Sequence, residues 1–349
     1  MKTVFKALSQ PFSNRINIEG KSYLYFSGTA YLSIPQNQDF INLYIEGIKK
    51  FGLNNGTSRN NNIQLGIYND AEQTAAKRYG AASALITSSG YLAAQLTVKE
   101  LSKTGKVIYA PATHPSLWHK NQQSPGKSFT LWADELITSL NQSEEKNWVI
   151  ISNSMNNLYP EIYNFDFLKN VHPDKNILLI VDDSHGIGIM NEGLSMFSVL
   201  PQQKNIKSVL VASMAKALGV DAGLVLSSKE IIDQLKHTNE FSGASPASAA
   251  GLYAFIRADE IYKQAWHKLQ HNVNLFASAL NNNWKFEAGF PVFQLNDAQL
   301  YNKLLSKQIL ISAFPYPSAD DDPINRIILS SWHTEADLAD LIAALKCFD

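Results

Sequence analysis

Short apolar runs alternate with longer amphipathic segments through the first two thirds of the chain, and this alternation limits the fold more than any other feature of the sequence. Several runs are apolar at nearly every position, as is typical of strands that have helices packed on both faces of their sheet. The pattern predicts an α/β domain in which helices flank a mostly parallel central sheet. The expected strands are 83–87, 106–110, 148–152, 177–181, 208–212 and 223–227, and the expected helices include 70–79, 91–102 and 165–171.

The pattern changes after about Ser228 to that of a smaller α+β domain. Its expected helices are 229–236, a long one at 245–280 and a final one at 335–345, and its expected strands are 291–295, 309–312 and 326–330. The stretch 21–26 near the N-terminus predicts an edge strand. We therefore expect an N-terminal segment (1–45) that packs across both domains, a large domain (46–235) and a small C-terminal domain (236–349).

Composition and charge exclude several classes of protein. The net charge of −1 at pH 7 argues against a general binder of nucleic acid or acidic membranes, because both need an excess of Lys and Arg. The single cysteine, Cys347, rules out an intrachain disulfide and a cysteine-based metal site, and fits a reducing compartment. No apolar run approaches the ~18 residues of a membrane span, and the N-terminus lacks the apolar core of a signal peptide. We expect a cytoplasmic protein with no membrane partner.

Polar side chains follow four of the expected strands, at the sheet edge where parallel α/β proteins bind ligands. After the first strand, Ser89 and Gly90 precede an expected helix; free N–H groups at a helix N-terminus bind phosphate, and glycine permits close approach. A serine N-cap followed by a tight turn would give the same pattern. After the second strand, His114 lies in a loop, where a surface or capping histidine is the structural alternative.

Two further strand ends carry residue types that are seldom buried without a partner. Asp182 extends the apolar strand 177–181 and needs a cation or backbone amides as its partner, and His185 follows in a glycine-bearing loop. No third ligand for a metal is evident, so we expect no metal site. Lys216, in Ser213-Met-Ala-Lys-Ala-Leu-Gly, follows the next strand. A desolvated lysine has a lowered pKa and attacks carbonyl groups, although a lysine that reaches solvent from a strand end would have the same placement.

One ligand explains these strand ends better than four separate structural roles do. A phosphate-binding turn, a histidine that stacks on an aromatic ring, a buried aspartate and a nucleophilic lysine are the groups needed to hold pyridoxal 5′-phosphate. The aspartate keeps the pyridine nitrogen protonated, so that the ring acts as an electron sink, and the lysine bonds covalently to the aldehyde. The sequence therefore predicts a pyridoxal-phosphate enzyme.

Over most of its length the chain resembles the α-oxoamine synthases, fold-type I pyridoxal-phosphate acyltransferases such as 8-amino-7-oxononanoate synthase and 2-amino-3-ketobutyrate CoA ligase. The most specific matches are Val181-Asp-Asp-Ser-His-Gly, close to the family's Val-Asp-Asp/Glu-x-His, and Ser213-Met-Ala-Lys-Ala-Leu-Gly, close to its Thr/Ser-x-x-Lys-Ala-x-Gly. Tyr23-Leu-Tyr-Phe-Ser-Gly-Thr-Ala-Tyr-Leu looks like an early family segment, and Gly56-Thr-Ser-Arg looks like its Gly-Ser-Arg motif. The resemblance implies the fold of the fold-type I PLP-dependent transferases.

The resemblance also implies roles for individual positions. Those that would contact the phosphate or nearby parts of the cofactor are Ser89, Gly90, Tyr91, Ser154 and Ser213. His114 would stack on the pyridine ring, Asp182 would contact the ring nitrogen, His185 would contact the phenolic oxygen, and Lys216 would carry the cofactor and move protons.

The implied reaction condenses an amino acid with an acyl-CoA thioester, usually with loss of CO₂, in a homodimer whose active sites lie at the subunit interface. By closeness of motif we favour an 8-amino-7-oxononanoate synthase-like activity that uses alanine and a long acyl thioester. Two alternatives stay open: an aminotransferase or other fold-type I lyase, and a non-catalytic relative that binds the cofactor or a partner enzyme. The intact set of His114, Asp182, His185 and Lys216 counts against the non-catalytic relative.

Several positions depart from the family's pattern, mainly on the substrate side. Pro315-Tyr-Pro stands where the family has an Arg-Pro-Pro that holds the substrate carboxylate, and Thr29 or Ala30 stands where it has an asparagine. Without that arginine, we expect Arg326 or Arg59 to bind the carboxylate. The sequence therefore determines the cofactor more firmly than the substrates.

Overall fold

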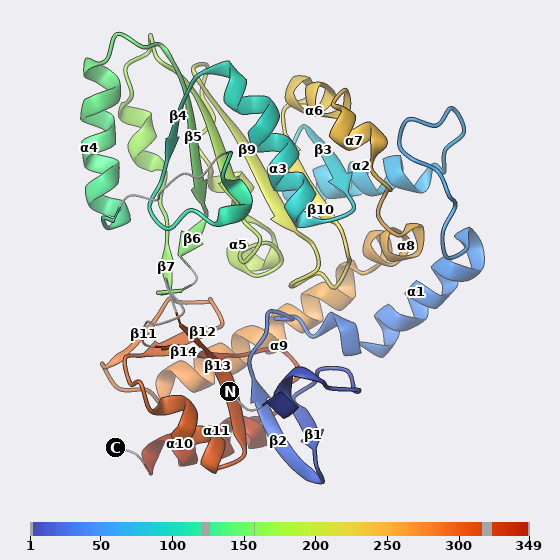
Figure 1. The fold of residues 1–349 in the computed structure, drawn as a ribbon, viewed down its shortest axis with the longest axis vertical. Helices are drawn as coiled ribbons and strands as arrows, with labels where there is room; N and C mark the ends of the chain where they lie inside the picture. The colour runs from blue at the N-terminus through green and yellow to red at the C-terminus, as the bar shows by residue number, and fades with distance from the viewer. Residues whose placement is uncertain (1–2, 120–125, 157, 316–322, 348–349) are drawn as a thin grey trace.

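The computed structural model describes residues 3–119, 126–156, 158–315 and 323–347, which are organised around two six-stranded sheets (Figure 1). The strands are β1 (Arg15–Ile18), β2 (Lys21–Phe26), β3 (Ser83–Thr87), β4 (Lys106–Tyr109), β5 (Asn147–Asn153), β6 (Met155–Asn156), β7 (Glu161–Ile162), β8 (Asn176–Asp182), β9 (Ile206–Ser213), β10 (Gly223–Ser227), β11 (Trp284–Phe286), β12 (Val292–Leu295), β13 (Ile309–Pro315) and β14 (Pro323–Ile328).

The α-helices are α1 (Gln38–Phe51), α2 (Ile67–Tyr79), α3 (Gly90–Leu101), α4 (Phe129–Gln142), α5 (Met190–Gly193), α6 (Lys229–Lys236), α7 (Asn239–Gly243), α8 (Ala249–Arg257), α9 (Asp259–Ser278), α10 (Leu300–Ser306) and α11 (Glu335–Lys346). Short 3₁₀ helices lie at Thr3–Lys6, Ile34–Gln36, Ser102–Thr104, Pro115–Leu117, Asp166–Asn170 and Met196–Val199. None of the helices in the described ranges combines the length and the apolar character that a membrane crossing requires.

The large domain is built on the sheet β3-β10-β9-β8-β5-β4. The neighbours β4, β5, β8 and β9 are parallel, whereas β10 runs antiparallel to both β9 and β3. β3 therefore points in the same direction as the parallel set, so five strands end at one edge, the edge nearer the second sheet in Figure 1. This arrangement confirms the mostly parallel α/β sheet that the apolar runs predict.

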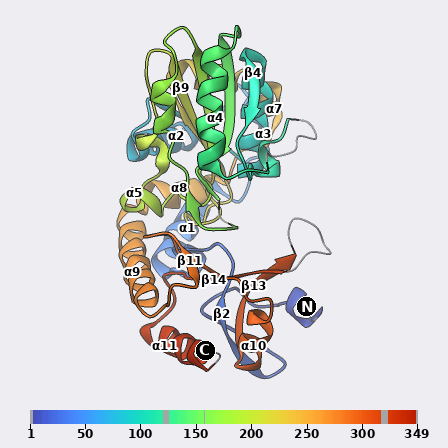
Figure 2. The same cartoon turned by 90° about the vertical axis from the view of Figure 1, so that its left-hand side faces the viewer.

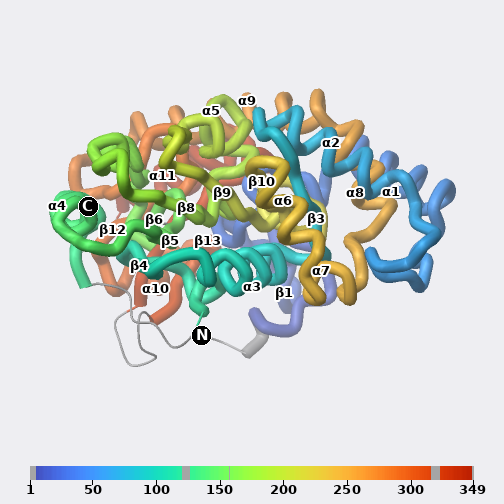
Figure 3. Tube along the Cα trace, turned by 90° about the horizontal axis from the view of Figure 1, so that it is seen from above, coloured from blue at the N-terminus to red at the C-terminus, as the bar shows by residue number. Residues whose placement is uncertain are grey.

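Helices cover both faces of this sheet, which explains why its strands lack an alternating polar pattern. Leu85 and Val149 belong to the core shared with α3 and α6, while Ile86 and Ile150 belong to the core shared with α2 and α4. All four side chains are at most 2% exposed. Figure 3 shows α3 and α2 on opposite sides of the strands. Because successive residues of a strand point to opposite faces, both sets are apolar when neither face meets water.

Two expectations about helices are wrong. The segment 165–171 forms a 3₁₀ helix at Asp166–Asn170 in place of an α-helix. The long helix expected over 245–280 is broken at the fully buried Ala258, where α8 ends and α9 begins. The break allows α8 to pack against α1 and α2, while α9 runs on from the large domain alongside the second sheet (Figure 2).

The second sheet joins the two ends of the chain, in the order β1-β2-β13-β14-β12-β11 (Figure 2). β2 pairs antiparallel with β1 and parallel with β13. The strand expected at 21–26 is therefore internal to the sheet, and β1 forms the edge. The N-terminal strands thus belong to the sheet of the C-terminal domain. The domain boundaries expected after residues 45 and 235 stay predictions.

A histidine of the small domain, His333, is buried in its neutral form. Its ring stacks on Phe26 with 4.2 Å between the ring centroids. Its Nδ1 accepts a hydrogen bond from the Ser330 N–H at 3.0 Å, and its Nε2 lies 2.9 Å from the Tyr25 carbonyl oxygen, to which it donates. Burial lowers the pKa of His333 to about 4.

We predict that His333 makes the protein less stable in acid. Its pKa is about 4 in the folded state and about 6.5 when the chain is unfolded. The unfolded state therefore binds the proton first as the pH falls below 6.5, and the stability that the neutral ring provides is lost on the way to pH 4. Through this residue alone, the free energy of unfolding should fall by about 2 kcal/mol between pH ~7 and pH ~5.

Urea unfolding of the wild type and of His333→Gln at both pH values measures this effect. The decrease in stability should be smaller in His333→Gln than in the wild type. His271→Gln changes an exposed histidine of α9 and should behave like the wild type. An equal pH dependence in the wild type and in His333→Gln would contradict the prediction.

Candidate active site

The five strands that end at one edge of the large sheet surround a small cavity of about 180 Å³. Its walls come from the segments that follow β3, β4, β5, β8 and β9. The lining residues are Gly90, Tyr91, His114, Ser116, Asn153, Met155, Asp182, Ser184, His185, Ser213 and Lys216. The structure therefore brings together the histidines, the aspartate and the lysine that the sequence places on separate strand ends. Among the described residues, no three His, Cys, Asp or Glu side chains are arranged to hold a metal ion.

The helix α3 begins at this cavity with a turn that leaves room for an anion. Ser89 is the N-cap, and its hydroxyl accepts a hydrogen bond from the Leu92 N–H at 3.2 Å. A Cβ on Gly90 would lie 2.5 Å from Cβ of Ser213, so only glycine fits where α3 meets the end of β9. The serine cap is therefore present, and it leaves the positive end of the helix dipole beside the Ser213 hydroxyl. This corner suits a phosphate group.

His114 is held in one tautomer by its own loop. Its Nδ1 accepts a hydrogen bond from the Ser116 N–H at 3.2 Å, so the neutral ring carries its proton on Nε2. Asn153 fixes this loop by donating to the Ala112 carbonyl at 2.7 Å and by accepting from the His114 N–H at 3.1 Å. Burial lowers the pKa of His114, Asp182 raises it and Lys216 lowers it further. The result is a neutral ring suited to stacking on another ring.

Two adjacent carboxyl groups at the end of β8 have different surroundings. Asp182 lines the cavity, and its Oδ1 accepts a hydrogen bond from the Ser184 N–H at 2.8 Å. Asp183 is fully buried, and its Oδ2 accepts from the Met196 N–H at 2.9 Å. Burial raises the pKa of Asp183 to about 7, the Met196 N–H and the Ser154 hydroxyl lower it, and Asp182 raises it. Of the two, Asp182 is the carboxylate that a ligand in the cavity would meet.

Lys216 lies partly buried in the loop between β9 and β10, next to His185. Its Nζ lies 3.0 Å from Nε2 of His185. Burial lowers the pKa of the Lys216 amine, and Asp182 opposes this shift. Burial, together with the charges of Lys216, Arg326 and His114, also lowers the pKa of His185 well below its usual range. An amine with a lowered pKa is a nucleophile, and the contact of Nζ with His185 favours this role over that of a lysine that reaches solvent.

Sequence reasoning missed four residues that line the cavity, Ser116, Asn153, Met155 and Ser184, and also Tyr31, which contacts His185. The Tyr31 hydroxyl lies 2.8 Å from Nδ1 of His185, and Asn153 holds the His114 loop as described above. The signal for Asn153 was a polar side chain at the end of an apolar strand. Tyr31 is only 1% exposed, and its one sequence signal was its place in the segment Tyr23 to Leu32 that looks like an early family segment.

Four of the residues expected at the site do not line the cavity: Ser89, Ser154, Arg59 and Arg326. Ser89 serves as the helix cap, and Ser154 is fully buried beside Asp183, so the cofactor contacts expected for both side chains stay predictions. In this chain, Nη1 of Arg59 lies 3.4 Å from the Glu72 carboxylate, and its guanidinium packs over two aromatic rings away from the cavity.

Arg326, by contrast, lies beside the site on β14 and is 8% exposed. Its charge acts on the Tyr31 hydroxyl and on the ring of His185. Pro315, which stands where the family has an arginine, is the last residue of β13, and the two residues that follow it in Pro315-Tyr-Pro lie outside the described residues. Of the two arginines expected to bind substrate, Arg326 is therefore the one near the cavity.

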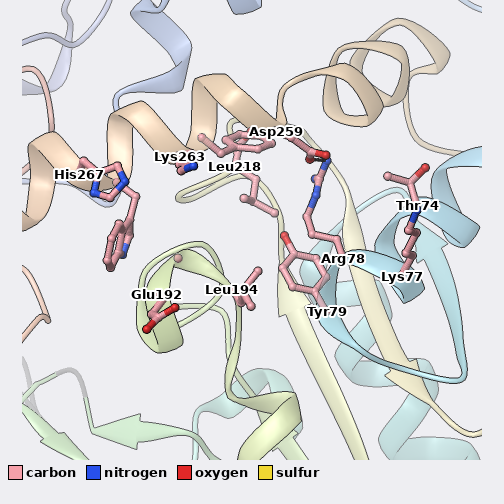
Figure 4. A pocket seen from close by; sticks show the side chains of 13 residues that line it. Thr74, Lys77, Arg78, Tyr79, Glu192, Leu194, Leu218, Asp259, Lys263 and His267 are labelled. Atoms are coloured by element: carbon pink, nitrogen blue, oxygen red, sulfur yellow. Dashed lines mark hydrogen bonds and ion pairs between the residues drawn. The ribbon is translucent and has the colours of Figure 1, made fainter.

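A larger cavity of about 810 Å³ lies away from these strand ends, between α2, α5 and α9 (Figure 4). Its arginine is already engaged, because Arg78 forms an ion pair with Asp259 and lies 4.2 Å from the centre of the Phe255 ring. Its remaining charged side chains, such as Glu192 and Lys263, come from different elements and form no ion pair with each other. We therefore assign the chemistry to the smaller cavity.

Comparison with known proteins identifies relatives along nearly the whole chain. A profile of the family described as "Aminotransferase class I and II" matches residues 32–345. The chain is 26% identical over 368 residues to the 8-amino-7-oxononanoate synthase of Buchnera aphidicola subsp. Baizongia pistaciae, covering 99% of this chain and 94% of that protein. It is 25% identical to the 8-amino-7-oxononanoate synthase of Hahella chejuensis, covering 97% of this chain and 90% of that protein.

Solved structures share the fold. A serine palmitoyltransferase from S. paucimobilis with bound PLP superimposes with a TM-score of 0.81 at 17% identity, covering 98% of this chain and 91% of that one. An 8-amino-7-oxononanoate synthase from Francisella tularensis has a TM-score of 0.68 at 20% identity, covering 93% of this chain and 98% of that one. These likenesses confirm the fold that the sequence predicts.

Proposed function

The chain belongs to the class I and II aminotransferase family, and from this we propose that it is a pyridoxal 5′-phosphate enzyme of the α-oxoamine synthase type. Such an enzyme joins the α-carbon of an amino acid to the acyl carbon of an acyl-CoA thioester, breaks the carbon–sulfur bond and releases CoA as a thiol. The observation that carries the proposal is the partly buried Lys216 amine beside His185, in one cavity with Asp182 and His114. Relatives named 8-amino-7-oxononanoate synthase favour acyl transfer over amino-group transfer.

The described residues fit this cofactor. The start of α3, where a Cβ on Gly90 would clash with Ser213, suits the phosphate. The neutral ring of His114 suits stacking on the pyridine, and the carboxylate of Asp182 suits a protonated ring nitrogen. Nε2 of His185 faces the cavity and suits the phenolic oxygen. The negative phosphate would thus meet the positive end of α3, the protonated ring nitrogen would meet the Asp182 carboxylate, and the pyridine ring would meet the His114 ring.

When bound, pyridoxal phosphate supplies an electron sink that stabilises negative charge at the α-carbon of an amino acid. Lys216 would hold the cofactor through its amine and move the proton at the α-carbon, and its lowered pKa suits both tasks. Asp182 would keep the ring nitrogen protonated, because a carboxylate beside a cation favours the charged form.

On the substrate side, Arg326 is our candidate for binding the amino-acid carboxylate. It is a cation from the small domain whose charge reaches Tyr31 and His185, and an arginine matches the planar geometry of a carboxylate. Alanine and a long acyl thioester are the substrates we favour, because the relatives are named for a product of that kind. The sequence resemblance also favours a homodimer in the cytoplasm, and both features stay predictions.

A substrate screen tests the proposal. The purified chain is incubated with pyridoxal phosphate, a panel of amino acids and a panel of acyl-CoA thioesters, and release of the CoA thiol is measured. We expect thiol release only when both substrates are present, with alanine and a long acyl chain the best pair. Amino-group transfer to a 2-oxo acid without thiol release would support an aminotransferase instead. A protein that takes up no pyridoxal phosphate would contradict both enzymes.

Lys216→Ala should abolish covalent retention of the cofactor and turnover, because the amine is the only group here expected to bond to the aldehyde. After borohydride reduction, mass spectrometry should find the added phosphopyridoxyl mass on the Lys216 peptide of the wild type and on no peptide of the variant. Lys229→Ala, at an exposed lysine of α6, should retain cofactor and activity. Thiol release by Lys216→Ala at the wild-type rate would contradict the assignment.

Arg326→Gln should raise KM for the amino acid about 10- to 100-fold, because a hydrogen bond to a charged group contributes about 1.5–3 kcal/mol. The value of kcat should change less, since the carboxylate is bound before the reaction begins. Arg257→Gln, at an exposed arginine of α8, is the matched control and should leave KM unchanged. A wild-type KM in Arg326→Gln would show that another group binds the carboxylate.

A further inference from the structure

Tyr31 does not line the cavity, but it contacts the histidine that faces Lys216. Resting on the proposed function, we propose that Tyr31 is a positioning residue: it fixes the tautomer of His185 and thereby keeps Nζ of Lys216 as a hydrogen-bond acceptor. An amine that accepts a hydrogen bond is neutral, and the neutral amine is the form that reacts with a carbonyl carbon. Tyr31 would therefore prepare Lys216 for its reaction without touching it.

The three side chains form one continuous line. The Tyr31 hydroxyl lies 2.8 Å from Nδ1 of His185, and Nε2 of the same ring lies 3.0 Å from Nζ of Lys216. Each ring nitrogen thus faces one of the two partners. A neutral imidazole has one N–H and one lone pair, so the partner at Nδ1 decides what Nε2 offers to Lys216.

The Tyr31 hydroxyl is the donor in its contact with His185. Burial raises the pKa of Tyr31 and Arg326 lowers it, and the net rise keeps the proton on the oxygen. Within the described part of the chain, Nδ1 of His185 is the hydrogen-bond partner of this hydroxyl. A buried hydroxyl proton without an acceptor would cost about 1–3 kcal/mol. Donation from Tyr31 to Nδ1 is therefore favoured over the reverse direction.

The single ring proton of His185 then lies on Nε2. The ring stays neutral because burial lowers its pKa, and the charges of Lys216, Arg326 and His114 lower it further. With Nδ1 accepting from Tyr31, Nε2–H points at Lys216, and an ammonium group has no lone pair to receive it. Asp182 acts in the opposite sense by raising the pKa of Lys216. The Tyr31 contact therefore works with burial, and against Asp182, to keep the amine neutral.

The position of Tyr31 is set by the large domain on one side. Gly219, in the loop that carries Lys216, has φ +65°, and a Cβ there would lie 2.5 Å from Cγ2 of Ile34. The segment 31–35 therefore packs directly on the Lys216 loop. The Tyr31 ring also meets Phe290 edge to face, with 6.1 Å between the ring centroids.

The small domain holds the same segment from the other side. The Ser331 N–H donates to the Tyr31 carbonyl at 2.8 Å, and the Trp332 N–H donates to the Ser33 hydroxyl at 2.7 Å. The Tyr31 hydroxyl is thus positioned by contacts from both domains. A change in the relative position of the two domains would therefore move the Tyr31 hydroxyl and alter the contact between His185 and Lys216.

The tautomer of His185 in the wild type is the first test. In the full-length chain without cofactor, ¹⁵N NMR of the histidine rings distinguishes a protonated from an unprotonated nitrogen, and His185→Gln identifies the signals. We expect a protonated Nε2 and an unprotonated Nδ1. A protonated Nδ1 in the wild type would overturn the proposal, whether or not any Tyr31 variant folds.

Tyr31→Phe is the second test, because it removes the hydroxyl and keeps the ring. The His185 signals should then report a mixture of tautomers, and the pKa of Lys216 should rise. Competitive labelling with acetic anhydride across a pH series, followed by mass spectrometry of the Lys216 peptide, measures that pKa. Tyr262→Phe is the matched control, since it removes a buried hydroxyl that donates to the Leu218 carbonyl at 2.9 Å. If Tyr31→Phe matches the wild type in both measurements, the proposal fails.

These two measurements need neither cofactor nor substrate, so they decide the role of Tyr31 even if the chain releases no CoA. If the chain does release CoA, Tyr31→Phe should lower kcat about tenfold near neutral pH, with a smaller change in KM. The acidic limb of its pH–rate profile should move to higher pH, because a lysine with a higher pKa is neutral only at higher pH. An unchanged kcat and pH profile would contradict the proposal.

Discussion

The contact between the partly buried Lys216 amine and the neutral ring of His185 is the interaction on which the site depends. Burial lowers the pKa of both side chains, and the charge of Lys216 lowers the pKa of His185 further. Asp182 limits this shift for the lysine from the end of the neighbouring strand. Burial thus favours the neutral form of the amine, and the neutral form is the nucleophilic one.

The sheet places these groups by combining parallel strands with one antiparallel strand. The parallel strands β4, β5, β8 and β9 end at the same edge, so the residues that follow them converge. β10 runs antiparallel to β9 and returns directly from it, which needs only a short loop, whereas a parallel neighbour needs a crossover. That short loop holds Lys216 against the sheet edge, between Asp182 and the segment 31–35.

The site also depends on the parts of the chain outside the large sheet. The N-terminal strands complete the sheet of the C-terminal domain, and the segment that follows them brings Tyr31 to His185. β14 of the same sheet brings Arg326 to the same histidine. The large domain thus supplies the groups suited to the cofactor. The two ends of the chain supply Tyr31 and Arg326, which we propose to position His185 and to bind the substrate carboxylate.

The sequence by itself determined the mostly parallel sheet and the cofactor-binding strand ends. Strands buried on both faces must be apolar at nearly every position, and the polar residues that follow them, His114, Asp182 and Lys216, stand out for that reason. Only the tertiary structure decided the break at Ala258, the internal position of β2 and the contact between Tyr31 and His185. It also decided that Arg326 lies near the cavity while Arg59 pairs with Glu72. Each of these features depends on which segments pack together although they are far apart in the sequence. A local pattern of apolar and polar residues shows that a segment is buried, but it does not show which segment covers it.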